Sequence, residues 1–136
     1  GTDGAAHGGL SLWNEMKIFR SVMNAGRGVL INEPALMPAK EILKMATKSG
    51  YEVIGEDGGS IEVGKKADFI MINMMQPHLY PTGNSVNTLL ECVTAGDVCD
   101  SVVNGEILMC DRKLQTIDET EVMERAREYM ERQEKV

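Results

Sequence analysis

The sequence predicts an α/β chain in which helices alternate with a small number of strands. Apolar residues recur at helical spacing in several segments, one almost continuous apolar run has the length of a strand, and an Asn-Gly pair separates two short strand-like segments. At 136 residues the chain has the size of one ordinary domain. Because about three strands are too few for a well-covered sheet, we expect apolar surface that has no partner within the chain.

The N-terminal part is predicted to hold a helix and a loop. Apolar side chains recur on one face of residues 10–25, and Ser11 is a suitable N-cap. Gly26 follows the last apolar position and is expected to end the helix. Trp13 is expected to pack against a neighbouring element rather than to stack on a ligand. Residues 27–36, which glycine and proline interrupt, are predicted as a loop.

The middle of the chain is predicted to contain a helix, a connector and a buried strand. Pro38 opens the helix at its first turn and Gly50 is expected to stop it. A short helical turn is expected at residues 51–54. Residues 55–66 are rich in glycine and are predicted as a connector of turns. Residues 67–74 are almost continuously apolar, which predicts a strand that is buried on both faces.

A helix and a hairpin are predicted next. Residues 84–94 have helical periodicity, and either Asn84 or Ser85 is suitable as the N-cap. Residues 98–110 contain Asn104-Gly105, the pair favoured in a type I′ turn. The segments on either side of this pair are therefore predicted to form a β-hairpin.

The C-terminal helix is predicted to begin near Asp118, with Glu121 placed for a capping box. Its apolar residues form one stripe, which consists of Val122, Ala126, Tyr129 and Met130. The remaining face is charged and is expected to be a solvated surface, because Glu and Arg at helical spacing support each other.

Charge and cysteine content exclude several classes of protein. The formal net charge of −7 and the isoelectric point near 4.8 argue against a surface for nucleic acid or anionic membrane, since both require clustered Lys and Arg. The three cysteines contain no CxxC pair and are expected to be reduced thiols. No apolar stretch has the length of a membrane span, and the first residues do not resemble a signal peptide. We therefore expect a cytoplasmic protein.

The chain offers few residues for chemistry. Asp3 precedes Gly4, which favours a sharp turn, and its carboxylate is suited to bind a divalent metal or to transfer a proton. Taken alone, an Asp before Gly is more often a structural residue of a turn. His7 lies in the same segment, but one Asp and one His do not complete a zinc site, which normally takes three protein ligands. His78 is predicted to be structural, because the sequence around it shows no second ligand.

Two other kinds of site have no support in the sequence. Residues 55–59 are glycine-rich, but they lack the Lys of a phosphate-binding loop and carry acidic residues that would repel phosphate. No Ser or Cys lies in a nucleophile elbow, so covalent catalysis is not predicted.

A set of segments, taken in order, resembles the C-terminal part of the amidohydrolase superfamily. The segments are Gly1-Thr2-Asp3-Gly4-Ala5-Ala6, Leu12-Trp13-Asn14-Glu15-Met16, residues 41–47, residues 59–68, Gln76-Pro77-His78 and Val103-Asn104-Gly105. The branch that they resemble most is that of the 5-methylthioadenosine and S-adenosylhomocysteine deaminases and related chlorohydrolases. The run from Gly59 to Asp68 is the most specific of these matches.

The resemblance implies a fold and a division of the chain. Residues 1–66 would be the C-terminal end of a (β/α)8 barrel, with Asp3 at the end of its last strand, where such barrels carry their catalytic residues. Residues 67–110 would belong to the small β-sandwich beside the barrel, and residues 111–136 would form a C-terminal helix. The expected fold class is thus α/β, as a C-terminal fragment of a TIM-barrel amidohydrolase with strands of the adjoining sandwich.

The resemblance also implies a chemistry. The aspartate that matches Asp3 binds the metal and takes a proton from metal-bound water, which then attacks the ring carbon that bears the leaving amine. The metal, zinc above all, assists by lowering the pKa of that water. The full-length enzyme would deaminate an adenosine-type substrate. An alternative within the superfamily is a chlorohydrolase or another aminohydrolase.

The superfamily's histidine ligands lie on earlier strands, which this sequence does not include. We therefore expect the chain alone to be inactive and to bind no stoichiometric metal. Its expected partners are the remainder of the barrel or an identical chain, in a homo-oligomer that binds neither nucleic acid nor membrane. A different hypothesis is a stand-alone structural or oligomerisation module without catalysis.

Overall fold

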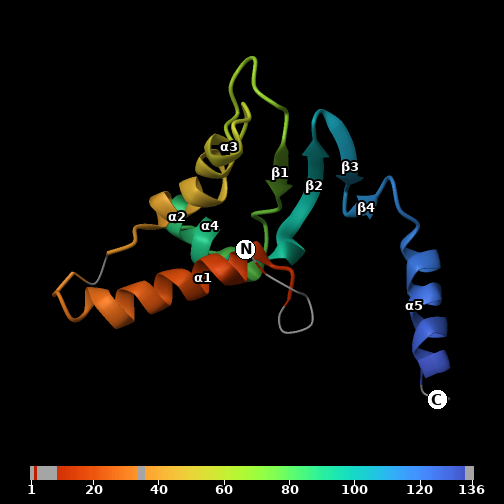
Figure 1. Cartoon of the computed structure of the whole chain (residues 1–136), viewed down its shortest axis with the longest axis horizontal. Coiled ribbons are helices and arrows are strands. Elements are labelled where there is room, and N and C mark those ends of the chain that lie inside the picture. The colour runs from red at the N-terminus through yellow and green to blue at the C-terminus, as the bar shows by residue number, and fades with distance from the viewer. Residues whose placement is uncertain (1, 3–8, 34–35, 134–136) are drawn as a thin grey trace.

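The computed structural model describes residues 2, 9–33 and 36–133. Helices α1, α2 and α4 form a helical body, a meander of strands forms one sheet, and α5 lies beyond the last strand (Figure 1). The helices are α1 (Leu12–Met23), α2 (Ala39–Ala46), α3 (Lys48–Ile54), α4 (Ser85–Glu91) and α5 (Glu119–Gln133). The strands are β1 (Phe69–Ile72), β2 (Val98–Val103), β3 (Glu106–Cys110) and β4 (Lys113–Leu114). Short helical turns occur at η1 (Asn24–Gly28), η2 (Pro77–Leu79) and η3 (Ala95–Asp97).

The core of the helical body lies between α1, α2 and α4. Its buried residues are Met16, Ala39, Ile42 and Leu90, and Leu90 is fully excluded from solvent. The predicted caps of two of these helices are confirmed. Ser11 Oγ accepts a hydrogen bond from the N–H of residue 14 at 3.4 Å, and Asn84 Oδ1 accepts two from the first turn of α4 at 3.1 Å.

The prediction that the first helix ends at Gly26 is wrong. Beyond Met23 the chain continues as the π-helical turn η1, in which Val29 N–H donates to the carbonyl of Asn24. Gly28 permits this continuation, because it has no side chain to obstruct the backbone of Glu33 where the chain folds back after η1. A Cβ on Gly28 would lie 2.5 Å from the carbonyl oxygen of Glu33.

The prediction that Gly50 stops the second helix is also wrong. The break comes earlier, at Thr47, whose backbone leaves the helical region at φ −124° and ψ −97°. The Thr47 hydroxyl donates to the carbonyl of Leu43 at 2.7 Å and competes with the helix's own hydrogen bonds. Gly50 lies inside α3, which ends instead at Gly55 in the left-handed conformation.

The sheet is an antiparallel meander with strand order β1-β2-β3-β4. The predicted hairpin is confirmed: β2 and β3 flank Asn104 and Gly105, whose φ angles are 50° and 80°. β4 was not predicted from the sequence. A second tight turn leads into it, with Asp111 and Arg112 both at positive φ.

The prediction that the apolar strand is buried on both faces is wrong for this chain. β1 lies at one edge of the sheet, and Phe69, Ile70 and Met71 are 37%, 45% and 49% exposed. Burial on both faces needs covering layers, and the described part of the chain supplies none over β1. The expected apolar surface without a partner is therefore present at this strand.

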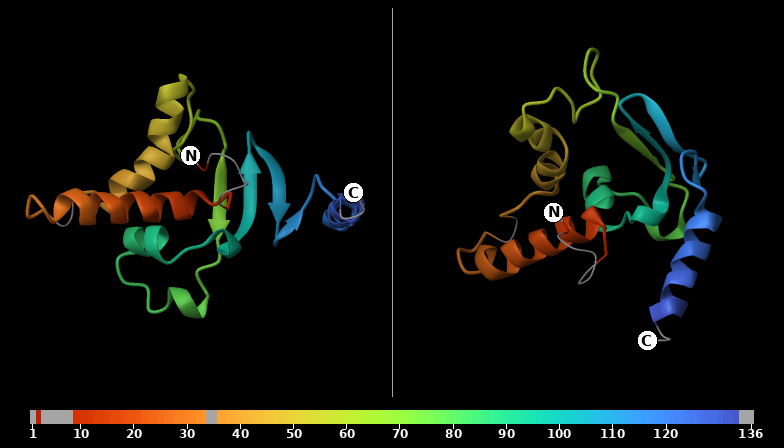
Figure 2. Two further views of the ribbon diagram at one scale, coloured as in Figure 1. Left: turned by 60° about the horizontal axis from the view of Figure 1, so that its bottom comes forward. Right: turned by 45° about the vertical axis from the view of Figure 1, so that its right-hand side comes forward.

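The C-terminal helix begins as predicted. Asp118 Oδ1 accepts hydrogen bonds from the N–H groups of Thr120 and Glu121, at 2.9 and 3.2 Å. Every residue of α5 is exposed. Figure 2 shows this helix beyond β4, on the side of the sheet away from α1 and α2. Its apolar stripe therefore faces solvent.

Candidate functional site

Asp3, the predicted metal ligand, and the nearby His7 lie outside the described residues. The assignment of Asp3 as a metal ligand and proton acceptor therefore stays a prediction. The described structure reveals how the helix that follows this segment is held.

Two polar side chains of α1 anchor it to the C-terminal end of α4. Trp13 Nε1 donates a hydrogen bond to the carbonyl of Leu89 at 2.8 Å. One turn later, Lys17 Nζ donates to the carbonyl of Val93 at 3.1 Å. The Leu89 carbonyl belongs to the last turn of α4, where a helix leaves its carbonyl groups without intrahelical partners, and Val93 lies just beyond that turn. The predicted structural role of Trp13 is confirmed.

A third anchor joins α1 to the N-terminal side of α2. Arg20 Nε donates to the carbonyl of Met37 at 3.2 Å, and its guanidinium also pairs with the carboxylate of Glu91 on α4. The side chain of Arg20 is only 20% exposed, so its contacts with α2 and α4 are largely shielded from solvent. Together the anchors fix the helix that directly follows the Asp3 segment.

The side chain of His78 contacts the carboxylate of Asp97. Its Nε2 lies 3.0 Å from Oδ2 of Asp97, a carboxylate that is 6% exposed. The same oxygen accepts hydrogen bonds from Thr94, at 2.8 Å from the backbone N–H and 2.9 Å from the hydroxyl. The local sequence around His78 does not contain this partner, because the fold brings Asp97 to it from 19 positions along the chain.

Hydrogen bonds from Thr94, the backbone N–H above all, and the contact with His78 lower the pKa of Asp97, although burial opposes the shift. The carboxylate is therefore held in its ionised form. The Thr94 hydroxyl donates to Asp97 and not to His78, so the three residues do not form a relay that activates a nucleophile. Their arrangement supports the structural role predicted for His78.

One local signal pointed to part of this cluster. Thr94 and Asp97 have the spacing of a capping box, and both of its reciprocal hydrogen bonds are present at η3. The carbonyl of Asp97 also accepts the N–H of Asn73, just after β1, at 2.8 Å. Asp97 thus joins the end of β1, the start of β2 and the His78 segment.

The run from Gly59 to Asp68 joins the helices to the sheet. The carboxylate of Asp68 accepts hydrogen bonds from the Tyr51 hydroxyl on α3 and from the backbone N–H of Asn104 in the hairpin turn. The carbonyl of Ala67 accepts the N–H of Gly105 at 3.0 Å. The run therefore holds α3 against the β2–β3 turn, and its role in the described structure is architectural.

Asp68→Ala is expected to lower the free energy of unfolding by about 1 to 3 kcal/mol, because it leaves the Tyr51 hydroxyl and the Asn104 N–H without their acceptor. Urea denaturation measures the loss. Asp57→Ala is the control: its carboxylate is 77% exposed and, among the described residues, pairs only with Lys65, so the loss should stay below about 1 kcal/mol. Equal losses for the two variants would contradict the assigned role of Asp68.

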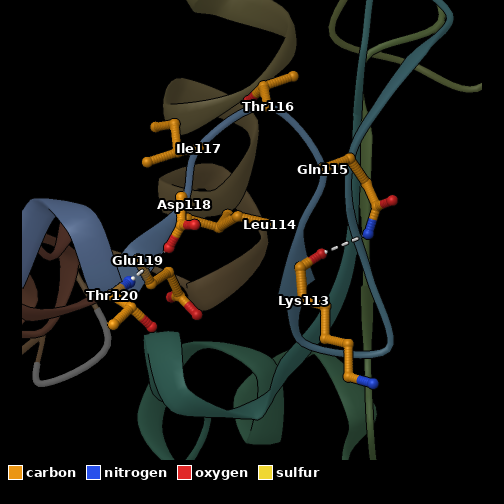
Figure 3. A pocket seen from close by; sticks show the side chains of 8 residues that line it. All are labelled: Lys113, Leu114, Gln115, Thr116, Ile117, Asp118, Glu119 and Thr120. Atoms are coloured by element: carbon orange, nitrogen blue, oxygen red, sulfur yellow. Dashed lines mark hydrogen bonds between the residues drawn. The ribbon is translucent and has the colours of Figure 1, made fainter.

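The described surface has no hollow that resembles a catalytic pocket. One shallow hollow is lined by residues 113–120, a single continuous stretch at the start of α5 (Figure 3). The dashed lines in Figure 3 mark two hydrogen bonds between residues two positions apart. Gln115 donates to the carbonyl of Lys113, and the Thr120 N–H donates to Asp118. This hollow is where the chain turns into α5 and brings no distant groups together.

The described residues also contain no group of three His, Cys, Asp or Glu side chains placed to hold a metal ion. Within the same part of the chain, none of the helices has the length and apolar character needed to cross a bilayer. A metal centre that involves Asp3 would therefore need ligands beyond those described here.

The Amidohydrolase family matches residues 1–108 of this sequence. The chain belongs to the amidohydrolase family. The match includes the Asp3 segment, the helical body and most of the hairpin, so the resemblance recognised from the sequence is confirmed.

Curated relatives within the family are deaminases. The chain is 41% identical over 125 residues to the 5-methylthioadenosine/S-adenosylhomocysteine deaminase of Dictyoglomus turgidum, a match that covers 90% of this chain and 28% of the relative. It is 35% identical over 128 residues to the 5'-deoxyadenosine deaminase of Methanosarcina acetivorans, with 93% of this chain and 29% of the relative covered. The chain spans less than a third of the length of these amidohydrolases.

Solved structures with the same fold include zinc-bound members of the superfamily. An adenosine deaminase from Xanthomonas campestris with bound zinc matches with a TM-score of 0.88 and 25% identity, over 100% of this chain and 31% of that one. The atrazine chlorohydrolase from Arthrobacter aurescens, complexed with zinc, matches with a TM-score of 0.69 and 24% identity, over 81% and 25% of the two chains. The second likeness concerns the fold alone.

Proposed function

We propose that this chain is the C-terminal part of a metal-dependent amidohydrolase that deaminates an adenosine-type substrate such as 5-methylthioadenosine or S-adenosylhomocysteine. The observation that carries the proposal is the 41% identity, over 90% of the chain, to a deaminase of that name. In this proposal residues 1–66 complete a barrel, residues 67–110 contribute to a sandwich and residues 111–136 add a helix. The helix α4 belongs by position to the second segment but packs against the first.

Asp3 is proposed as the residue of this chain that binds the metal and accepts a proton. A carboxylate suits zinc and other divalent ions, and zinc occurs in two of the related structures. The described residues do not form a metal site by themselves, so the remaining ligands would come from another segment. A zinc ion in such a centre supplies Lewis acidity, which lowers the pKa of bound water.

The described residues support Asp3 by anchoring the helix that follows it. Trp13, Lys17 and Arg20 tie α1 to α4 and α2 through side-chain hydrogen bonds to backbone carbonyls. Rigid support matters because a misplacement of about 1 Å in a catalytic group can cost about 100-fold in rate. The chain's own contribution to the reaction is thus one functional carboxylate on a firmly held scaffold.

A chimera tests the proposal. The segment of the Dictyoglomus turgidum deaminase that matches this chain would be replaced by this chain, and ammonia release from 5-methylthioadenosine and S-adenosylhomocysteine would be measured together with the zinc content. We expect an active chimera with bound zinc. Asp3→Asn is expected to lower its kcat/KM by more than about 100-fold, because it removes both a metal ligand and the proton acceptor.

Asp118→Asn is the control, because it makes the same chemical change at an exposed helix cap of α5. It should leave kcat/KM within about twofold, as a surface change away from the chemistry. An inactive chimera that is folded and zinc-loaded, or an active Asp3→Asn variant, would contradict the proposal. The isolated chain should bind well under one zinc per molecule, and one tightly bound zinc per isolated chain would also contradict it.

The alternative function is a stand-alone oligomerisation module without catalysis. The exposed apolar surface of β1 and α5 favours it, since large apolar patches mark interaction surfaces. A chimera that folds but neither binds zinc nor releases ammonia would favour this alternative.

A further inference from the structure

The hairpin turn between β2 and β3 carries a chemically labile pair of residues. Asn104 is the one asparagine of the sequence that directly precedes a glycine. Glycine has no side chain to shield its backbone nitrogen, so this nitrogen can approach the side-chain amide of the preceding asparagine. Both Asn104 and Gly105 are exposed, so water and hydroxide reach them. Neither the proposed function nor the architecture of the hairpin uses this reactivity.

The reaction open to such a pair is the spontaneous deamidation of asparagine. The Gly105 nitrogen loses its proton to hydroxide and attacks Cγ of the Asn104 side chain. The new C–N bond closes a succinimide ring, and the side-chain nitrogen takes up a proton from water and leaves as ammonia. A second water molecule then opens the ring. Its attack at one carbonyl carbon yields aspartate, and its attack at the other yields isoaspartate, in which the main chain runs through the former side chain.

Two hydrogen bonds hold the turn in a conformation that resists this reaction. The N–H of Gly105 donates to the carbonyl of Ala67 at 3.0 Å, and the N–H of Asn104 donates to the carboxylate of Asp68. The nitrogen that has to attack is therefore engaged as a donor, and the two turn residues are fixed at φ angles of 50° and 80°. Because ring closure requires rotation of this backbone, the hydrogen bonds must open before the reaction proceeds.

The charge of Asp68 opposes the reaction as well. The attacking form of the Gly105 nitrogen is an anion, and a neighbouring carboxylate makes such an anion less favourable. The Tyr51 hydroxyl of α3 donates to the same carboxylate and so keeps it at the turn. Asp68 therefore acts on the labile pair both through a hydrogen bond and through its charge.

We propose that Asn104 is a modification site at which deamidation is suppressed by the contacts of the turn with Ala67 and Asp68 and proceeds when these contacts open. The product carries a carboxylate at residue 104, near that of Asp68, and like charges at close range repel each other. Isoaspartate in addition lengthens the backbone of the turn. Both changes oppose re-formation of the joint between α3 and the hairpin. The inference stands on the hairpin and does not depend on the proposed deaminase function.

Mass spectrometry of the complete chain tests the proposal. The chain is incubated in mildly alkaline buffer, and the conversion of residue 104 from amide to acid is followed on the peptide that contains it. An isoaspartyl methyltransferase assay measures the isoaspartate separately. We expect the folded parent chain to react at least about 10-fold more slowly than the same chain unfolded in urea, because only opened turns react. Asp68→Ala, which removes the acceptor of the Asn104 N–H, should react about 10-fold faster than the folded parent.

Two further variants separate the local contact from general stability. Asp97→Ala also removes a carboxylate that holds segments together, but its partners are His78 and Thr94, so its rate should stay within about twofold of the parent. Asp68→Asn keeps an oxygen acceptor and loses the charge, and it should react faster than the parent and more slowly than Asp68→Ala. It keeps the test valid if circular dichroism shows that Asp68→Ala is unfolded.

Three results would overturn the proposal. The first is a folded parent chain that deamidates as fast as the unfolded chain. The second is a folded Asp68 variant, alanine or asparagine, that reacts no faster than the parent. The third is an acceleration by Asp97→Ala as large as that by Asp68→Ala, since it would mean that general stability and not the contact with the turn controls the reaction.

Discussion

Gly59→Ala is expected to lower the free energy of unfolding by about 2 to 4 kcal/mol, because the new side chain meets both backbone strain and a steric clash. Gly59 has a φ of 72°, a conformation that residues with a Cβ adopt at a cost. A Cβ there would lie 2.7 Å from Lys48 Cα and 2.9 Å from the carbonyl carbon of Thr47. These are backbone atoms at the break between α2 and α3, so they cannot turn aside as a flexible side chain would.

Gly55→Ala separates the two causes. Gly55 also has a φ of 72°, but a Cβ built on it meets no atom within 4 Å. Its replacement should therefore cost about 1 to 2 kcal/mol, the cost of the left-handed conformation alone. Urea denaturation of the two variants measures the difference. Equal losses would mean that the contact between Gly59 and the Thr47–Lys48 backbone has no energetic role.

Two glycines lie at the start of the run from Gly59 to Asp68, Gly58 directly before it and Gly59 as its first residue. Gly58 packs against the ring of Tyr51, in space that a Cβ would occupy, and Gly59 packs against the break between α2 and α3. Asp68 then bonds both to Tyr51 and to the hairpin turn. The run thus contacts three separate elements: the break between α2 and α3, α3 itself and the hairpin turn. None of its described contacts resembles a catalytic arrangement.

Features that depend on neighbouring residues could be predicted from the sequence. The Asn104-Gly105 turn requires two positive φ angles, and Asx and Ser caps require one hydrogen bond to a nearby N–H, so a short sequence decides each. The helix boundaries at Gly26 and Gly50 were wrong for a physical reason. Glycine permits the end of a helix but does not require it, and the surrounding contacts decided both cases.

Features that depend on distant residues could not be predicted in this way. The apolar sequence of β1 is typical of a strand that is covered on both faces. Its observed exposure depends on whether other elements of the chain pack over it, and the strand's own sequence does not determine that. The pair of His78 and Asp97 joins residues 19 positions apart through a fold that no local pattern specifies. The functional assignment of Asp3 came from the order of motifs along the chain, because a single carboxylate before glycine is not distinctive.

Asp97→Ala is expected to lower the free energy of unfolding by about 2 to 4 kcal/mol at neutral pH, because it removes a buried carboxylate that accepts two hydrogen bonds from Thr94 and contacts His78 where three segments meet. The loss should depend on pH. The folded state lowers the pKa of Asp97, so its carboxylate stabilises the fold at pH values above its unfolded pKa of about 4. That stabilisation disappears as the pH falls through the lower folded pKa. Urea denaturation from pH 7 to pH 3 should therefore show the difference between parent and variant shrinking in acid.

His78→Gln separates the histidine from the carboxylate it contacts. The His78 side chain is 48% exposed, and its removal leaves both hydrogen bonds from Thr94 to Asp97 in place. The expected loss is below about 1 kcal/mol, because an exposed partner of a polar pair contributes little. A pH-independent loss for Asp97→Ala would show that its side chain acts through packing rather than charge. A larger loss of stability for His78→Gln than for Asp97→Ala would contradict this assignment. It would mean that His78, and not the hydrogen bonds between Thr94 and Asp97, stabilises the junction.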